Sequence, residues 1–148
     1  MTTSNSKDKS VLTKKIDINA SRKKVWEILT KPEETNKWIQ GAQINTDWKV
    51  NNPILWVGKI DEKETTFVKG TILKIEPEQT LTYSTFETLN GLNGIHENYL
   101  NVTYNLNDRN EHTVLTITNQ ILDKAELENI ENTWEKTLLN IKKIAEEQ

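Results

Sequence analysis

The chain has 148 residues, of which 34% are hydrophobic and 28% charged, and its formal net charge is −3. This length corresponds to one domain, and no apolar run approaches the roughly 18 residues that a membrane span needs. The lack of cysteine excludes disulfides, thiolate metal sites and cysteine nucleophiles, and the acidic balance argues against general nucleic-acid binding.

The N-terminal part of the chain is predicted to be a disordered arm, then a strand and two short helices. Residues 1–10 are polar and lack the apolar segment of a secretion signal, so we expect a cytoplasmic protein. Alternating apolar residues predict a strand over Val11–Ile18. Ser21 is a suitable cap for a helix that runs to about Leu29, and a second short helix is expected over Glu33–Lys37.

Six further strands are predicted from a period of two that begins at Gln43. Short polar turns separate them, which is typical of an antiparallel meander rather than of βαβ units. The expected ranges are Gln43–Val50, Ile54–Ile60, Thr65–Ile75, Thr80–Phe86, Glu97–Leu106 and His112–Gln120. The segment Glu87–Ile95 contains two Asn-Gly pairs and is expected to be a mobile loop.

The last predicted element is a long amphipathic helix that Asp123 and Glu126 cap at its start. It should run to about Ala145, roughly 34 Å at 1.5 Å per residue. Its apolar stripe consists of Leu127, Ile130, Trp134, Leu138, Ile141 and Ala145. A stripe of this length must be buried against the sheet. The sequence therefore predicts an α+β helix-grip fold in one domain over residues 11–146, with a curved seven-stranded antiparallel sheet around the C-terminal helix and two short helices after the first strand.

Motifs distributed over residues 11–145 resemble those of one superfamily. They include Ile18-Asn19-Ala20-Ser21, Trp48-Lys49-Val50, Lys69-Gly70, Leu81-Thr82-Tyr83, Val102-Thr103-Tyr104 and Trp134 with Leu138. In this order and spacing they resemble the START-like superfamily (SRPBCC, or Bet v allergen-like), and within it the branch named for the activator of the heat-shock-protein ATPase. Two departures are Thr133, where a small residue is expected, and Lys24, where relatives tend to carry Glu.

The resemblance implies a helix-grip domain and leaves several functions open. Members of the superfamily bind lipids, sterols, polyketides and plant phenolics, some are cyclases, and one branch contacts a chaperone. A shared fold does not decide between these functions.

Inward-facing aromatic and apolar residues form the candidate ligand site. They predict a cavity between the sheet and the C-terminal helix for an apolar or aromatic small molecule of lipid, polyketide or phenolic type, with no cofactor. Access would be gated by the loop Glu87–Ile95 and the short helices. Core filling is the alternative for each aromatic residue. The candidate residues are Trp38, Trp48, Trp56, Tyr83, Asn98, Leu100, Val102, Tyr104, Ile117, Trp134, Leu138 and Ile141. Asn98 is expected to point inward because it alternates with Leu100.

A basic run suggests an alternative function as a protein-interaction module of the chaperone ATPase activator type. Arg22, Lys23 and Lys24 lie in the first turn of a helix, where cations oppose the macrodipole. They are candidate partner-binding residues, although a solvated charge run is the ordinary explanation. We expect a monomer or weak dimer whose partners are a small apolar molecule or, in this alternative, a chaperone, and neither nucleic acid nor a membrane.

A third hypothesis is a cavity enzyme such as a cyclase or hydrolase. Its acid–base group would have to be Glu97 or His96, helped by Asn98 or Tyr83. The sequence favours a binding protein over an enzyme, because no catalytic motif or dinucleotide fingerprint appears. No metal site is expected either, since the two histidines, His96 and His112, are predicted to be solvated and lack convergent ligands.

Overall fold

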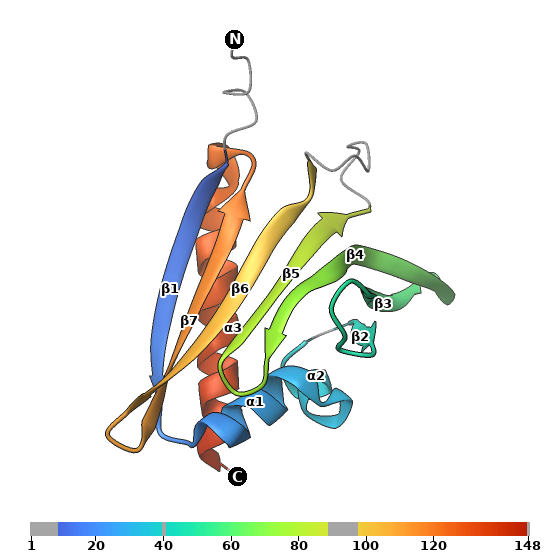
Figure 1. The fold of residues 1–148 in the computed structure, drawn as a ribbon. Helices are drawn as coiled ribbons and strands as arrows, with labels where there is room; N and C mark the ends of the chain where they lie inside the picture. The colour runs from blue at the N-terminus through green and yellow to red at the C-terminus, as the bar shows by residue number, and fades with distance from the viewer. Residues whose placement is uncertain (1–8, 40, 89–97, 148) are drawn as a thin grey trace.

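The computed structural model describes residues 9–39, 41–88 and 98–147, and within them one curved antiparallel sheet stands beside a long helix (Figure 1). The strand order is β1-β7-β6-β5-β4-β3-β2, with every neighbouring pair antiparallel. The strands are β1 (Ser10–Ile18), β2 (Gln43–Thr46), β3 (Pro53–Ile60), β4 (Lys63–Glu76), β5 (Thr80–Glu87), β6 (Leu100–Arg109) and β7 (His112–Ile121), and the helices are α1 (Arg22–Thr30), α2 (Pro32–Trp38) and α3 (Leu127–Glu147). The predicted helix-grip fold is confirmed.

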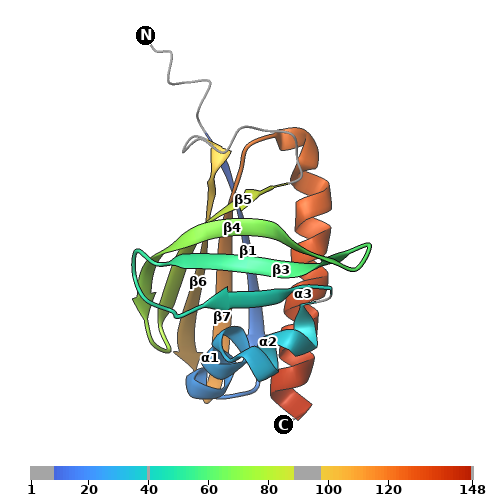
Figure 2. The same cartoon turned by 90° about the vertical axis from the view of Figure 1, so that its right-hand side faces the viewer.

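Strand β4 bends the sheet, so that β2, β3 and β4 cross the direction of α3 (Figure 2). Its pairing with β3 skips Phe67, and its pairing with β5 skips Leu73, so this strand carries an extra residue at each place. Extra residues of this kind bend a strand and increase its twist. Gly70 lies between them and permits a close backbone approach, because a Cβ atom there would be 1.6 Å from the carbonyl oxygen of Ser84.

The two short helices form a fixed unit between β1 and β2. Ser21 Oγ accepts a hydrogen bond from Lys24 N at 3.2 Å, which confirms the predicted cap. Pro32 occupies the first turn of α2, where its missing N–H costs nothing. The indole N–H of Trp38 donates to the carbonyl of Ile28 at 2.8 Å, and this buried hydrogen bond anchors α2 to α1.

Helix α3 is tightly packed in its C-terminal half and loosely covered in its N-terminal half. Leu138, Ile141 and Ala145 are 1–2% exposed, whereas Leu127 is 40% exposed and Trp134 is partly exposed. The helix packs against β1 and the two short helices. Asp123 caps a 3-10 turn over Lys124–Glu126, as expected of a residue at the start of the helical segment, and the α-helix itself begins after this turn at Leu127.

The C-terminal end of α3 is fixed by polar contacts to β1 and to the segment that follows it. Lys142 Nζ donates to the backbone oxygen of Asp17 at 2.9 Å, and Glu146 accepts from the backbone N–H of Asn19 at 2.8 Å. The hydrogen bond from Lys142, and then that from Asn19, hold the pKa of Glu146 below its usual range. His112 Nδ1 lies 2.7 Å from Asp17 Oδ2, so this histidine, whose side chain is 38% exposed, also has a carboxylate beside it.

Two predicted strand boundaries were also wrong. Strand β2 ends at Thr46, because Trp48 has a φ of 59° and turns the chain there. Strand β6 begins at Leu100, so Asn98 lies before the strand, and the alternation that aimed it inward does not reach it. Within the described residues, no helix is long and apolar enough to cross a membrane.

Candidate functional site

Four aromatic rings from β3, β5, β6 and α3 meet on the concave side of the sheet, and we call them the aromatic row. Trp56 lies 5.3 Å from Tyr83 between ring centroids, Tyr83 lies 5.7 Å from Tyr104, and Tyr104 lies 6.1 Å from Trp134. The last two pairs are nearly perpendicular, an arrangement that aromatic quadrupoles favour. The row joins residues that are far apart in the sequence into one continuous aromatic surface.

The strand register explains why the two tyrosines meet. Tyr83 pairs with Val102, and Leu81 pairs with Tyr104, so the tyrosines are diagonal neighbours on one face of the sheet. Their hydroxyl oxygens are 2.8 Å apart, and each residue is only 4% exposed. One hydroxyl donates to the other, which leaves the second proton of the pair outside this hydrogen bond.

Both hydroxyls are neutral at physiological pH, and burial makes them still harder to ionise. It raises the pKa of Tyr104 to about 12, and burial followed by the neighbouring Tyr104 raises the pKa of Tyr83 well above 10.0. Neither residue is therefore suited to act as a base in neutral solution. As neutral hydroxyls, the two groups can each serve as hydrogen-bond donor or acceptor.

The raised pKa values predict a loss of stability in alkaline solution. A tyrosine that is harder to ionise when folded stabilises the protein fully below its unfolded pKa of 10.0, and this contribution disappears as the pH rises to about 12. For Tyr104 the contribution is about 2–3 kcal/mol. Urea unfolding at a series of pH values should show a shallower alkaline loss for Tyr104→Phe than for the unchanged protein. Equal slopes would contradict the buried hydroxyl pair.

A polar contact fixes the orientation of Trp134. Its indole N–H donates to Asn119 Oδ1 at 2.8 Å, and Asn119 Nδ2 donates to the backbone oxygen of Gln120 at 2.7 Å. Asn119 faces inward on β7, where its amide oxygen accepts from the Trp134 side chain. This contact holds the tryptophan ring against Tyr104 at the end of the row.

Most of the predicted ligand-site residues lie in or against one apolar cluster. The cluster contains Trp38, Tyr83, Val102, Tyr104, Ile117, Leu138 and Ile141, and Trp48, Trp56 and Trp134 pack against it while remaining partly exposed. Trp38 lies between the two short helices. Leu100 is the first residue of β6 and Asn98 lies before the strand, both outside this cluster. Trp56 and Trp134, at the two ends of the row, are therefore its partly exposed members, whereas Tyr83 and Tyr104 between them are buried.

The structure describes only part of the residues proposed for the two alternative functions. Arg22 Nε is 3.1 Å from Asp108 Oδ1, so this cation already has an acidic partner, whereas Lys23 is exposed. Lys24 has interactions of its own. His96 and Glu97, proposed as acid–base groups, lie outside the described residues, as does the loop from residue 89 to 95. Among the residues that the structure describes, no group of three or more His, Cys, Asp or Glu could hold a metal ion.

Comparisons with known proteins agree with this architecture. The family model "Activator of Hsp90 ATPase homolog 1-like protein" matches residues 19–146. A solved protein from Cytophaga hutchinsonii is 32% identical, with a TM-score of 0.81 over 93% of this chain and 94% of that chain. No curated protein matches the chain.

Two more distant structures share the fold alone. The Aha1 dimer from Colwellia psychrerythraea is 16% identical, with a TM-score of 0.72 over 92% of this chain and 96% of that chain. CalU16 from Micromonospora echinospora is 17% identical, with a TM-score of 0.68 over 90% of this chain and 82% of that chain. The predicted resemblance to the START-like superfamily is confirmed.

Proposed function

The chain belongs to the Activator of Hsp90 ATPase homolog 1-like family, and we propose that it binds a small apolar or aromatic molecule between its sheet and α3. The aromatic row is the observation that supports this proposal most strongly. Its end members, Trp56 and Trp134, remain partly exposed although they face the concave side. Covering exposed aromatic surface is favourable at roughly 25 cal/mol per Å², which a flat apolar ligand would gain.

The chemistry of the row favours a ligand with one hydrogen-bond acceptor. The proton of the Tyr83–Tyr104 pair that is not used between the hydroxyls can be donated to a carbonyl or phenol oxygen. A mostly apolar lining with a few placed polar groups is typical of small-molecule sites. Phenolic and polyketide-type molecules combine a flat apolar body with such an acceptor, and they are the ligand class that we favour over saturated lipids.

Access to the row is proposed beside the N-terminal half of α3. In this half Leu127 is 40% exposed, whereas Leu138 farther along the helix is 2% exposed. A helix end that is held by few buried side chains opens at low cost in free energy. The well-packed C-terminal half would then act as the fixed end about which the first turns move.

The alternative functions have weaker support. Arg22 is paired with Asp108, which reduces the charge that the basic run offers to an acidic partner. The neutral Tyr83 cannot assist as a base near pH 7, because burial and Tyr104 raise its pKa. Binding without chemistry therefore agrees best with the described residues.

A thermal-shift screen against flavonoid-like phenolics, aromatic polyketides and lipids tests the proposal. A molecule that binds the native state raises the melting temperature progressively with its concentration. Trp134→Ala should abolish the shift. Leu139→Ala, at a position on α3 that is 55% exposed, is the matched control and should retain it. If the aromatic row only fills the core, none of these ligand classes would raise the melting temperature.

A further inference from the structure

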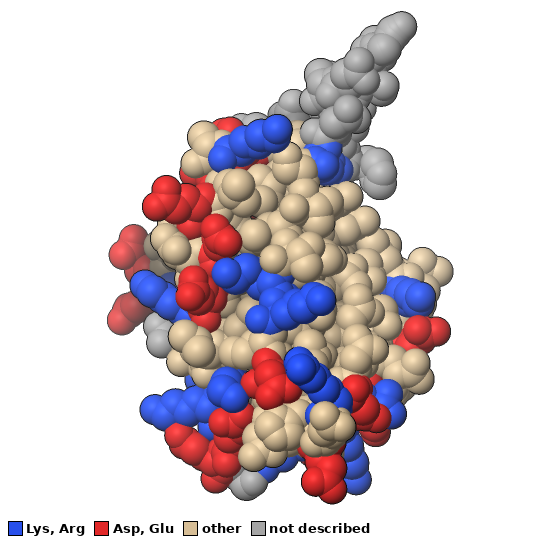
Figure 3. Space-filling view, turned by 90° about the vertical axis from the view of Figure 1, so that its left-hand side faces the viewer, with Lys and Arg blue, Asp and Glu red and all other residues tan. Residues whose placement is uncertain are grey.

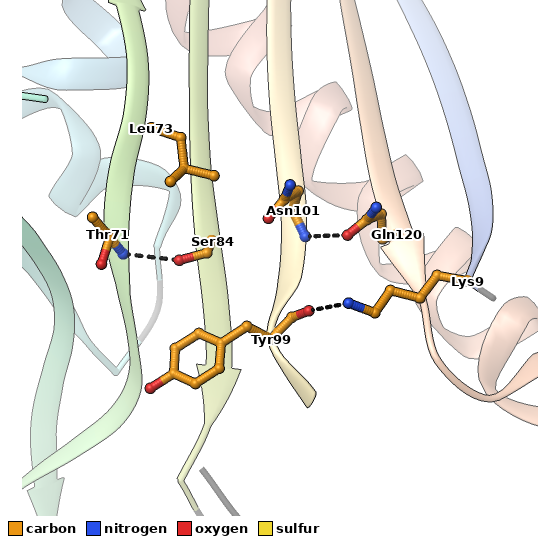
Figure 4. A pocket seen from close by; sticks show the side chains of 7 residues that line it. All are labelled: Lys9, Thr71, Leu73, Ser84, Tyr99, Asn101 and Gln120. Atoms are coloured by element: carbon orange, nitrogen blue, oxygen red, sulfur yellow. Dashed lines mark hydrogen bonds between the residues drawn. The ribbon is translucent and has the colours of Figure 1, made fainter. Parts of the chain in front are cut away.

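The outer face of the sheet carries a hollow of about 510 Å³ on the side opposite the aromatic row (Figure 4). It is lined by Lys9, Thr71, Leu73, Ser84, Tyr99, Asn101 and Gln120. On β5 and β6 its residues alternate with Tyr83 and Val102, which face the interior. The surrounding surface includes a broad area without charged side chains (Figure 3).

The hollow forms where side chains replace neighbouring strands as hydrogen-bond partners. Thr71 N donates to Ser84 Oγ at 3.0 Å, and Asn101 N donates to Gln120 Oε1 at 2.8 Å. Lys9 Nζ donates to the backbone oxygen of Tyr99 at 2.8 Å. The small side chain of Ser84, only 9% exposed, forms the floor of the depression.

These hydrogen bonds occupy two side-chain acceptors of the lining, Ser84 Oγ and Gln120 Oε1, and leave the donors of the same two side chains. Ser84 Oγ and Gln120 Oε1 each accept a backbone N–H, so the Ser84 hydroxyl proton and the Gln120 amide protons remain for another partner. Lys9 uses one of its three protons on Tyr99. In the part of the chain that the structure describes, these donors have no further acceptor.

Two walls of the hollow are apolar. Leu73 is 41% exposed beside it, and the ring of Tyr99 is stacked on Phe86 with centroids 5.1 Å apart and planes at 22°. Figure 4 shows Leu73 and Tyr99 on either side of Ser84, with Asn101 and Gln120 on the β6–β7 side. The site thus combines an apolar surface with converging donors.

We propose that this hollow binds a small carboxylate with an attached apolar group, as a second site independent of the aromatic row. The lining contains one cation, Lys9, and none of its seven residues is acidic. One ammonium matches a monoanion, and hydrogen bonds to a carboxylate are roughly twice as strong as neutral ones. The apolar part would lie against Leu73 and Tyr99. The volume falls within the range of small-molecule pockets.

The test is a titration with benzoate, followed by the NMR signals of the Ser84 and Asn101 amides and the Gln120 side-chain amide. Benzamide has the same shape without the charge and should bind at least about tenfold more weakly. Phenyl phosphate, a dianion, should bind no more tightly than benzoate. Tighter binding of phenyl phosphate, equal binding of benzamide, or benzoate shifts confined to the tryptophan indoles would overturn the proposal.

Three variants separate the charge from the fold. Gln120→Glu keeps an oxygen acceptor for Asn101 N but adds a negative charge, and it should abolish benzoate binding. Lys9→Gln should weaken binding by about tenfold. Lys15→Gln, which removes a lysine from β1 that does not line the hollow, is the matched control and should leave binding unchanged. Benzoate affinity that survives both Gln120→Glu and Lys9→Gln would contradict the site, whatever the aromatic row binds.

Discussion

Replacing Gly70 with alanine is expected to destabilise the domain by at least about 3 kcal/mol, or to prevent folding. The added Cβ would lie 1.6 Å from the carbonyl oxygen of Ser84 and 2.5 Å from its carbonyl carbon. These are backbone atoms, so no rotamer change relieves the clash, and β4 would have to separate from β5. Such a loss is a large part of the 5–15 kcal/mol that stabilises a typical domain. Urea unfolding followed by circular dichroism measures it.

Ser84→Ala is the matched comparison for Gly70→Ala. It removes the hydroxyl that accepts from Thr71 N but leaves the backbone contact intact, so it should cost only about 1 kcal/mol. The double variant should be no more stable than Gly70→Ala alone, because the clash is with the backbone. A Gly70→Ala protein within 1 kcal/mol of the unchanged protein would mean that β4 does not approach β5 this closely.

Ile141→Ala is expected to cost about 2–5 kcal/mol, more than Trp134→Ala, although tryptophan is the larger residue. Ile141 is 1% exposed in the well-packed half of α3, and its truncation leaves a cavity. Trp134 is partly exposed and loses one hydrogen bond to Asn119 and one edge contact with Tyr104. Its truncation should cost less than the 3 kcal/mol at which core tryptophan losses begin.

The two variants are compared by urea unfolding under identical conditions. The comparison requires that the free energy of unfolding depend on urea concentration with the same slope in both. Leu139→Ala, on the exposed side of the same helix, should lie within about 0.5 kcal/mol of the unchanged protein. If Trp134→Ala lowered the free energy of unfolding as much as Ile141→Ala or more, α3 would be packed evenly along its length. This result would contradict the proposal that a ligand reaches the aromatic row beside the N-terminal half of α3.

The sequence was most informative where alternation and core burial coincide. On β5 and β7 the inward positions are mostly apolar, including Leu81, Leu115 and Ile117, and the predicted bounds of each strand differ from the structure by one residue. The stripe from Leu127 to Ala145 likewise predicted α3. The aromatic residues of the row could be selected from the same periods, because alternation fixes which face of an element a side chain occupies.

The remaining features depend on local backbone conformations, such as a positive φ or an extra residue in a strand, which the alternation of apolar residues does not reveal. The pattern Ile44, Thr46, Trp48 continues past the end of β2, and nothing in it indicates that Trp48 adopts a positive φ. Extra residues at Phe67 and Leu73 shift the alternation of β4, which left the face of this strand undetermined. The outer hollow was missed for a related reason, since it arises from hydrogen bonds between side chains and the backbone of neighbouring strands.

The most direct test of the aromatic row as a ligand site uses the indole N–H signals of the five tryptophans during titration with a flavonoid-like phenolic. We predict that the Trp56 and Trp134 signals shift together and saturate. Trp38, whose indole is buried and bonded to the carbonyl of Ile28, should stay in place as an internal reference. Signals of Trp56 and Trp134 that remain unchanged throughout the titration, or that shift only in proportion with Trp38, would contradict the proposed binding function.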